Sequence, residues 1–316
     1  MRGGYMLLEL FQFRRIRSLL ARGRRRRTLS NRWGGLFSDS IRIEALDRDA
    51  GRFSCQLEQL EPKKVLAVDV DLTGTVLTVS FDDQADDAIS LAITPTGYEV
   101  NGANVSSGTG TITKLVVTDA GTAKTSRFDL TEASQNLTGG LTIGSQVENA
   151  DISSAVNTAG GNVTIDSSTL TLAADINSGS GSQTYGGAVV LANDVTLLTD
   201  TGVAGNVQIE FQGTVDSDTS ARTLDVRSEA IYARAAIGGT SALASYGGQT
   251  LGDAAERGQS YRSITTLGGQ VFQAETSSGD IEFNGTYTTF NSNIALVGEG
   301  SFGVYLSLVG DTAIDV

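Results

Sequence analysis

Histidine is absent from the 316-residue chain, and cysteine occurs once, as Cys55. The lack of histidine excludes histidine-ligated metal sites and nucleophiles that are activated by an imidazole base. A single cysteine excludes an intramolecular disulfide and a CxxC zinc site. Because Cys55 precedes the main body of the chain, we expect it to have no reactive role. The sequence therefore predicts no cofactor and no metal centre.

Proline, tryptophan and long apolar runs are also scarce. The chain contains two prolines, one tryptophan and 6% aromatic residues, which argues against a large aromatic-lined pocket. The 38 glycines show neither a collagen period nor a proline-rich context. No apolar run approaches the length of a transmembrane helix. A hydrophobic content of 40% is nevertheless enough for a core, so we expect a folded chain without a transmembrane span.

The formal net charge of −13 conceals two regions of opposite sign. Residues 1–64 contain 15 Lys and Arg against 7 Asp and Glu, whereas residues 65–316 contain 8 against 29. Because residues 65–316 are strongly acidic, they would repel phosphate groups, and nucleic acid is not expected as a partner. The chain is therefore interpreted as a basic leader over residues 1–64 and an acidic body over residues 65–316.

The basic leader begins with an apolar patch at residues 6–13, which precedes the arginines, including the run Arg24–Arg27. A secretory signal has the reverse order, so a standard signal peptide is not predicted. Three interpretations remain open: a disordered leader or residues added by an early start codon, a leader that acts in export, and an arginine-rich tail for nucleic acid. A helical leader could lie on an anionic membrane. We favour the first interpretation.

The acidic body alternates apolar and polar residues in short segments. This period of two, with many β-branched residues, predicts strands. The best helical window, Ser241–Arg257, is interrupted by glycines, so the body is predicted to be all-β. The apolar residues that are expected to share a buried face are Leu77, Val79 and Phe81; Val163 and Ile165; Leu170, Leu172 and Ala174; Val195 and Leu197; Val207, Ile209 and Phe211; and Ile281 and Phe283.

Two sequence anchors recur in the same order. Gln183–Tyr185 returns as Gln259–Tyr261 after 76 residues, and Ile209–Thr214 returns as Ile281–Thr286 after 72 residues. Glycines that precede strands are often spaced by about 20 to 30 residues, the range of solenoid coils. We therefore predict a parallel β-helix with a repeat of about three coils, although a β-sandwich also offers regular short strands.

The predicted β-helix has open strand edges at its ends, and such edges need a cap. Residues 65–105 are expected to form an N-terminal cap or a small β segment. Residues 106–316 are expected to form the β-helix repeats.

The boundary between the basic leader and the acidic body carries an export-type motif. It resembles the LEPR-xLL motif of large exported proteins of planctomycete-type bacteria, with Lys63 in place of arginine and Val65 in place of the first leucine of the pair. This resemblance covers eight residues and implies that the body is exported, whereas an ordinary linker is the alternative. The motif residues are Leu60, Glu61, Pro62, Lys63, Lys64, Val65, Leu66 and Ala67.

A second resemblance covers residues 180–290, about a third of the chain. The succession SQTYGGAVVLANDVTLLTD, GNVQIEFQGTVDSD and AAIGGTSALASY is similar to repeats of bacterial filamentous-haemagglutinin-like and adhesin-type exoproteins. The resemblance implies a right-handed parallel β-helix in a secreted or cell-surface protein. Such proteins often continue through many more repeats, so one interpretation is that this chain is part of a longer protein.

The densest acidic cluster comprises Asp82, Asp83, Asp86 and Asp87. These residues could supply several oxygen ligands to calcium. The cluster lacks the glycine and bidentate glutamate of an EF-hand, and also the period of a calcium-binding β-roll. A solvated turn is the favoured interpretation.

A carbohydrate-active β-helix enzyme, of the polysaccharide lyase or glycosidase type, is the alternative function. It would need paired carboxylates in a groove beside a cation. Glu210 and Glu282 recur at equivalent repeat positions, which indicates a repeated outward surface, and nothing in the sequence makes Asp200, Asp216 and Asp218 converge. We therefore predict a non-enzymatic, exported or cell-surface β-solenoid with an adhesin-like or exterior structural role. It would bind surface polysaccharide or other cells through a repeated polar face.

Overall fold

A computed structural model shows that the acidic body is built from strands. The chain forms two units, residues 1–64 and 65–316. The basic leader, the export-type motif and the acidic cluster at 82–87 lie outside the described residues. The structure describes residues 68–81, 88–100, 103–104, 110–120, 126–199, 207–251, 258–274, 280–283, 287–289, 294–298, 305–308 and 313–315.

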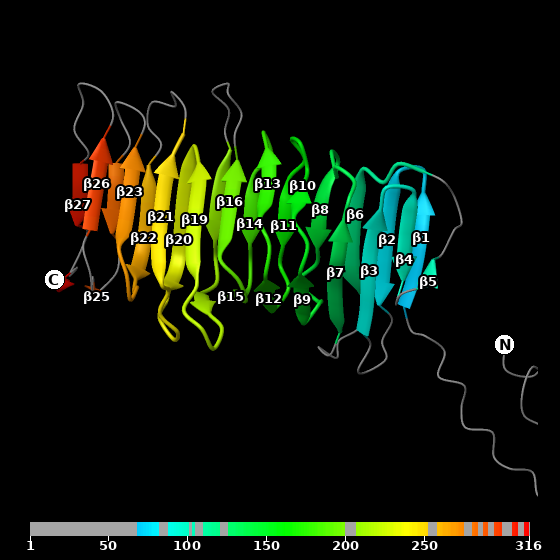
Figure 1. Cartoon of the computed structure of the whole chain (residues 1–316), viewed down its shortest axis with the longest axis horizontal. Coiled ribbons are helices and arrows are strands. Elements are labelled where there is room, and N and C mark those ends of the chain that lie inside the picture. The colour runs from blue at the N-terminus through cyan, green and yellow to red at the C-terminus, as the bar shows by residue number, and fades with distance from the viewer. Residues whose placement is uncertain are drawn as a thin grey trace, which may run out of the picture. The chain divides into compact units, whose positions relative to one another are not determined.

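The strands form parallel ladders along the long axis of this unit (Figure 1). In the first ladder, each strand pairs in parallel with the next strand of the same ladder. Its strands are β2 (Val76–Phe81), β6 (Lys114–Asp119), β8 (Gly140–Ile143), β11 (Val163–Ile165), β14 (Gln183–Tyr185), β17 (Gln208–Phe211), β20 (Ala230–Ile237), β22 (Gln259–Ile264), β24 (Asp280–Phe283) and β27 (Tyr305–Leu308).

The second ladder joins the first at β20, which is long enough to pair with both β17 and β18. The two ladders therefore belong to one 19-stranded sheet. The strands of the second ladder are β3 (Ala88–Thr94), β7 (Arg127–Ala133), β9 (Asn149–Ile152), β12 (Thr169–Leu172), β15 (Ala188–Leu191) and β18 (Val215–Ser217).

The third ladder is a separate 7-stranded parallel sheet. Its strands are β10 (Val156–Asn157), β13 (Ile176–Gly179), β16 (Val195–Thr199), β19 (Thr223–Ser228), β21 (Ser245–Thr250), β23 (Gln270–Ala274) and β26 (Ile294–Gly298). A small parallel pair is formed by β25 (Tyr287–Thr289) and β28 (Ala313–Asp315).

The chain visits the three ladders in turn and then begins the next coil. From β8 it passes to β9 and β10, and it returns to the first ladder as β11, which pairs with β8. No helix occurs among the described residues. The prediction of an all-β, parallel β-helix is therefore confirmed.

Antiparallel strands lie at the N-terminal end of the ladders. There β1 (Val68–Thr73) pairs with β2, β4 (Gly97–Val100) pairs with β3, and β5 (Ala103–Asn104) pairs with β4. Gly74, in the turn between β1 and β2, has a φ of +64°, which favours glycine. These hairpins come from the region that the sequence predicts as a cap or small β segment.

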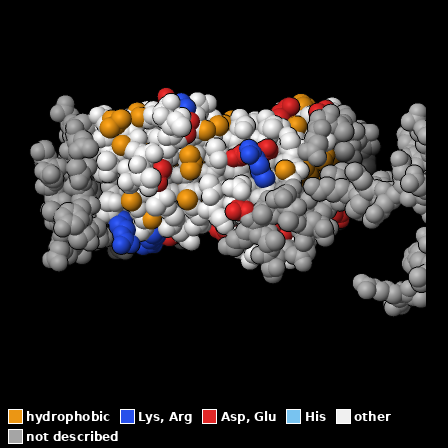
Figure 2. Space-filling model, turned by 90° about the horizontal axis from the view of Figure 1, so that it is seen from below, with side chains coloured by type: hydrophobic (Ala, Val, Ile, Leu, Met, Phe, Trp, Pro, Cys, Tyr) orange, Lys and Arg blue, Asp and Glu red, His pale blue; other side chains and the backbone are white. Residues whose placement is uncertain are grey.

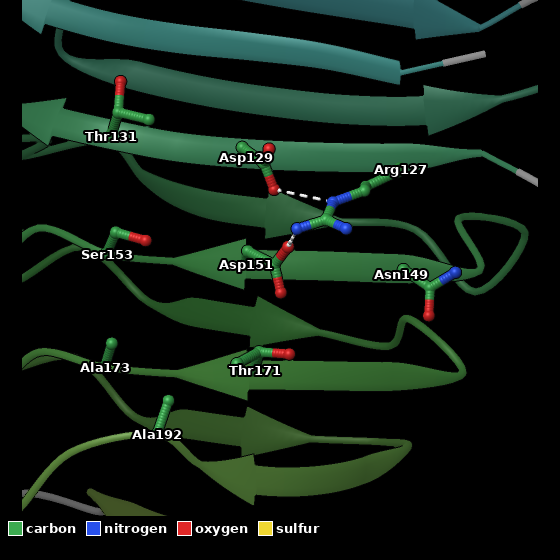
Figure 3. Close-up of a pocket in the computed structure, with 9 residues that line it drawn as sticks. All are labelled: Arg127, Asp129, Thr131, Asn149, Asp151, Ser153, Thr171, Ala173 and Ala192. Carbon is green, nitrogen blue, oxygen red and sulfur yellow. Dashed lines mark hydrogen bonds and ion pairs between the residues drawn. The ribbon is translucent and has the colours of Figure 1, made fainter.

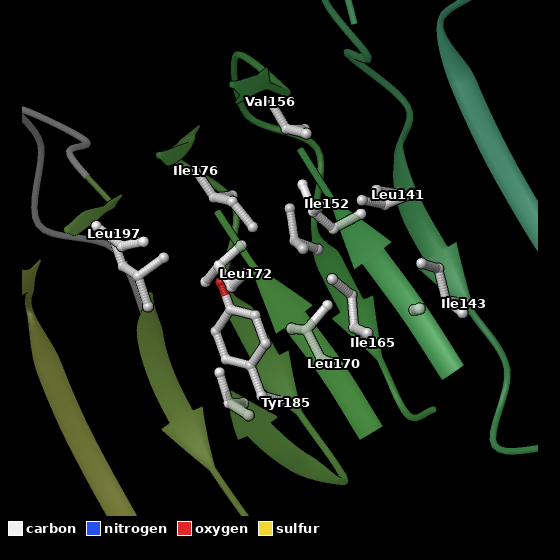
Figure 4. Packing of buried hydrophobic residues seen from close by; sticks show 14 of the residues in the cluster. Leu141, Ile143, Ile152, Val156, Ile165, Leu170, Leu172, Ile176, Tyr185 and Leu197 are labelled. Atoms are coloured by element: carbon white, nitrogen blue, oxygen red, sulfur yellow. The ribbon is translucent and has the colours of Figure 1, made fainter. Parts of the chain in front are cut away.

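The core is a continuous column of apolar side chains that point inward from all three ladders (Figure 4). Because the strands are in register, Ile143 of β8 lies opposite Ile165 of β11, which lies opposite Tyr185 of β14. Among the described side chains, the apolar faces that the alternation predicts are buried with one exception, and the side chain of Phe283 lies outside the described residues. Ala174 is half-buried, since β12 ends at Leu172 and the chain turns outward there.

The repeat found in the sequence corresponds to three coils. The strands β14 and β22 hold the first anchor, and β17 and β20 lie between them in the first ladder. The second anchor follows in the same register each time, with Gln183 opposite Ile209 and Gln259 opposite Ile281. The segment between β16 and β17, in the first copy of the repeat, is longer than the equivalent segment between β23 and β24 in the second copy. This difference accounts for most of the change from 76 to 72 residues.

Candidate functional site

An open depression of about 380 Å³ lies on the outer surface of the second ladder (Figure 3). It spans neighbouring coils, because its lining comes from β7, β9 and β12 and from residues just after β9, β12 and β15. Its lining residues are Arg127, Asp129, Thr131, Asn149, Asp151, Ser153, Thr171, Ala173 and Ala192.

Strand register places the charged residues of the depression side by side. Phe128 and Leu130 of β7 point into the core, so Asp129 between them points outward. Asp129 lies opposite Asp151 of β9, which lies opposite Thr171 of β12. Two carboxylates from adjacent coils therefore share one surface.

Arg127 binds both carboxylates. Its Nε lies 3.1 Å from Oδ1 of Asp129, and its Nη2 lies 2.5 Å from Oδ2 of Asp151. The Arg127 side chain is 57% exposed, whereas those of Asp129 and Asp151 are 30% and 15% exposed. The guanidinium thus covers two better buried carboxylates and leaves the group with an excess of negative charge.

The pKa values of the two carboxyl groups are shifted in opposite directions. Burial, together with a hydrogen bond to Asp151, raises the pKa of Asp129 above its usual range. Burial also opposes ionisation of Asp151, but hydrogen bonds with Asp129 and Thr171 and the charge of Arg127 outweigh it and lower the pKa of Asp151. The pKa values of these two neighbouring carboxyl groups are therefore moved apart by their different surroundings.

Other arginines of the body form simpler pairs. Arg227 contacts Asp225 at 2.6 Å, and Arg234 contacts Glu210 at 3.0 Å. In the part of the chain that the structure describes, Arg127 is the one arginine with two carboxylates within ion-pair distance. The depression therefore differs in composition from the ordinary charged surface.

Two of the acidic residues that the sequence singled out, Asp216 and Asp218, are bound by neighbouring turns. Asp216 Oδ1 accepts hydrogen bonds from the backbone N–H groups of Thr240 and Ser241, and Asp218 pairs with Arg222 in the turn before β19. Asp216 and Asp218 thus bind separate partners, and the structure does not bring them together in a paired site.

The predicted outward face at Glu210 is observed, since this residue lies on the outer side of β17 and pairs with Arg234. Asp200 and the side chain of Glu282 lie outside the described residues.

Sequence reasoning missed Asp129 and Asp151, although a signal is present. Arg127 and Asp129 are followed 22 residues later by Asn149 and Asp151, within the coil length expected of a solenoid. Alternation alone places Asp129 and Asp151 outward, but the loop lengths that set the 22-residue step were needed to place them opposite each other.

Among the described residues, no group of three or more acidic or cysteine side chains could hold a metal ion. Within the same residues, no helix is both long and apolar enough to cross a membrane. No protein-family model, no curated protein and no solved structure matches this chain.

Proposed function

We propose that the protein is an exported or cell-surface β-solenoid with an adhesin-like or exterior structural role. In this role it contacts surface polysaccharide or other cells through a repeated polar face. The observation that carries the proposal is a row of outward hydroxyl groups in register. Thr142, Thr164 and Thr184 lie opposite one another on β8, β11 and β14, each between two inward-facing residues.

The parallel ladder gives this row its regular spacing. Adjacent strands are about 4.8 Å apart, so equivalent hydroxyl groups recur at that interval along the surface. Figure 2 shows one face on which uncharged surface predominates, with acidic and basic side chains in small separate groups. Each hydrogen bond to a polymeric ligand is weak, but a rigid row of similar groups raises the avidity for a repeating ligand.

Export is the second part of the proposal, and the sequence supports it. The LEPR-like motif at residues 60–67 stands at the boundary between the basic leader and the acidic body. The body carries 8 Lys and Arg against 29 Asp and Glu, and this charge keeps an exterior rod soluble and unassociated.

The test of export is fractionation of the source cells with an antibody to the body. We expect recovery from the medium or the cell exterior. Recovery from the cytosol alone would contradict the proposal.

The test of the polar face is a triple variant, Thr142→Val, Thr164→Val and Thr184→Val, in the full chain. Valine keeps the shape and β-propensity of threonine but removes the hydroxyl group. We expect weaker binding to intact cells or their polysaccharide, with an unchanged circular dichroism spectrum. Undiminished binding by a folded triple variant would show that this row is not the contact surface.

A second candidate, a carbohydrate-active enzyme, is favoured by the depression of Figure 3. Glycoside hydrolysis uses two carboxyl groups whose pKa values are shifted apart, and here the pKa of Asp129 is raised whereas that of Asp151 is lowered. In that case Asp129 would act as the general acid and Asp151 as the base or nucleophile.

Release of new reducing ends from a panel of polysaccharides would test the enzymatic candidate. The activity should be lost in Asp129→Asn and Asp151→Asn and kept in Asp225→Asn, which alters a charged pair elsewhere on the rod. A wild-type protein that releases nothing from the panel would contradict this candidate.

A further inference from the structure

We infer that the depression around Arg127, Asp129 and Asp151 binds a neutral, polyhydroxylated segment of a glycan. This inference rests on the proposed function, because it takes the ligand to be a polysaccharide and specifies where it binds and of what class it is. Its basis is the combination of a hollow surface, a mixed set of hydrogen-bonding groups and a negative local charge.

The depression is large enough for a small ligand. Its volume of about 380 Å³ lies within the range of roughly 300–1,000 Å³ that is typical of ligand sites. It crosses several strands, since the lining comes from β7, β9, β12 and Ala192 after β15. An extended polymer that lay along the axis of the rod would therefore contact several coils in the depression.

The polar groups of the lining match hydroxyl groups. Sugar hydroxyls both donate and accept hydrogen bonds, and the depression offers both kinds of partner. The carboxylates of Asp129 and Asp151 accept, the Arg127 guanidinium donates, and the Asn149 amide does both. Hydrogen bonds to charged groups are stronger than neutral ones, so the depression would add to the contacts that the threonine row makes.

The charge of the depression selects against acidic sugars. Two carboxylates face one guanidinium, and both ion-pair contacts of Arg127 go to these carboxylates. The surrounding body is acidic as well, with 8 Lys and Arg against 29 Asp and Glu after residue 64. An anionic residue such as a uronate would meet repulsion without a free cation to bind it.

Small side chains provide the space beside the charged group. Ser153, Ala173 and Ala192 lie on successive coils at the ends of β9, β12 and β15. Ala173 and Ala192 donate backbone hydrogen bonds to the preceding coil, which keeps this side of the depression rigid. Their methyl groups form a low apolar surface on which the C–H face of a sugar ring would rest.

The experiment is a binding titration of the full chain with neutral oligosaccharides and with uronate oligosaccharides of equal length. The test variants are Asp151→Asn and Arg127→Gln, which change the polar groups, and Ala173→Gln, which fills the space without a change of charge. The matched controls are Asp225→Asn and Arg227→Gln, since Asp225 and Arg227 form an exposed pair on β19, outside the depression. Thermal unfolding of each variant establishes that it is folded.

We expect the wild type to prefer neutral oligosaccharides, each test variant to lose at least tenfold in affinity, and the controls to change less than twofold. Glycan binding that is unaffected by all three test variants would overturn this inference and leave polysaccharide binding elsewhere on the rod intact. A preference for uronates would overturn the ligand class. If the wild type bound neither glycans nor cells, the adhesin-like role would fail and this inference with it.

Discussion

Two buried glutamine–tyrosine pairs show how single residues stabilise the interior of this β-helix. The Gln259 Nε2 donates to the carbonyl oxygens of Gly248 and Gln273, at 3.2 and 2.9 Å. Its Oε1 accepts from the hydroxyl of Tyr261 at 2.8 Å. Tyr261 has one hydroxyl proton, so the 2.7 Å contact between Tyr246 and Tyr261 must be donated by Tyr246. Burial raises the pKa of both tyrosines, which therefore stay protonated.

The first coil of the repeat contains the same arrangement. Gln183 donates to the carbonyl oxygens of Ile176 and Leu198 and accepts from the hydroxyl of Tyr185. The recurring sequence Gln-x-Tyr is thus an interior polar motif, in which each glutamine ties the first ladder to the third.

The direction of these hydrogen bonds leads to a prediction about Tyr261→Phe and Tyr246→Phe. Loss of the Tyr261 hydroxyl leaves both Gln259 Oε1 and the Tyr246 hydroxyl without their buried partner. Loss of the Tyr246 hydroxyl leaves the bond from Tyr261 to Gln259 in place. We expect Tyr261→Phe to lower the free energy of unfolding by about 1–3 kcal/mol and Tyr246→Phe by less. Urea denaturation of the two variants measures the difference, and the reverse order would contradict the assigned donors.

The opposite pKa shifts in the depression predict opposite effects of Asp151→Asn and Asp129→Asn. The lowered pKa of Asp151 stabilises the fold above the ordinary aspartate range, and this contribution is lost as the pH falls through the lowered value. The raised pKa of Asp129 means that its contribution is present at low pH and lost as the pH rises through the raised value.

At pH 7 we therefore expect Asp151→Asn to be destabilising and Asp129→Asn to be neutral or stabilising. Each effect should be up to about 1 kcal/mol, because both groups are partly solvated. As the pH falls through the lowered pKa of Asp151, the deficit of Asp151→Asn should disappear. Denaturation curves over a series of pH values from 7 downward provide the measurement, and equal destabilisation by both substitutions at pH 7 would contradict the assignment.

At the scale of the strands and turns, the corners determine how closely the coils stack. Asp175 Oδ1 accepts a hydrogen bond from the backbone N–H of Thr196, and Asp194 Oδ1 accepts one from Thr223, at 2.7 and 2.8 Å. Each aspartate therefore binds the following coil. Part of the acidic surplus of the body is explained by this use of aspartate in turns rather than by ligand binding.

The corner between β14 and β15 predicts a large loss of stability when Gly187 is replaced by alanine. A Cβ atom there would lie 1.9 Å from the backbone oxygen of Ser167 and 2.6 Å from that of Ser168, on the preceding coil. Backbone cannot move aside without separating the coils, so Gly187→Ala should cost more than about 2 kcal/mol.

Gly110→Ala is the matched control, since its Cβ would meet only the Leu72 Cδ2 at 3.8 Å, an ordinary contact. Melting curves of the two variants provide the comparison. Similar melting temperatures would show that the corner tolerates a wider spacing than the structure indicates.

At the scale of the whole molecule, the three-coil repeat predicts that a complete unit can be removed. Excision of residues 183–258 joins Ser182 to Gln259, so that β22 would take the place of β14 beside β11. Gln259 and Tyr261 would then occupy the interior positions of Gln183 and Tyr185. We expect a folded protein that is shorter by about 14 Å, since three strand spacings of about 4.8 Å are lost.

Excision of residues 171–246, a segment of the same length, is the control. It joins Leu170 of β12 in the second ladder to Gly247 of β21 in the third, so the fused strand cannot serve both ladders and that coil lacks one of its three strands. Small-angle scattering and circular dichroism would distinguish the two products. A folded control, or an unfolded product from the first excision, would contradict the three-coil unit.

Much of this architecture could be predicted because its cause is local and periodic. Alternation along Leu77, Val79 and Phe81 predicts a strand with one buried face, and the structure buries all three. The return of Gln183–Tyr185 as Gln259–Tyr261 predicts coils that stack in a repeat, as observed. Ala174 departs from the alternation because the strand ends before it, and single-strand periodicity does not report where a strand ends.

By itself, the sequence determined an all-β body, a buried aliphatic column and a three-coil repeat, since these follow from which residues alternate and recur. The tertiary structure alone decided which outward side chains meet. Asp129 and Asp151 are 22 residues apart, and their contact depends on the lengths of the turns that bring one coil into register with the next. Register between coils is a long-range property, because the length of each turn shifts every later residue along the stack. The depression exists only where that register places two carboxylates beside one arginine.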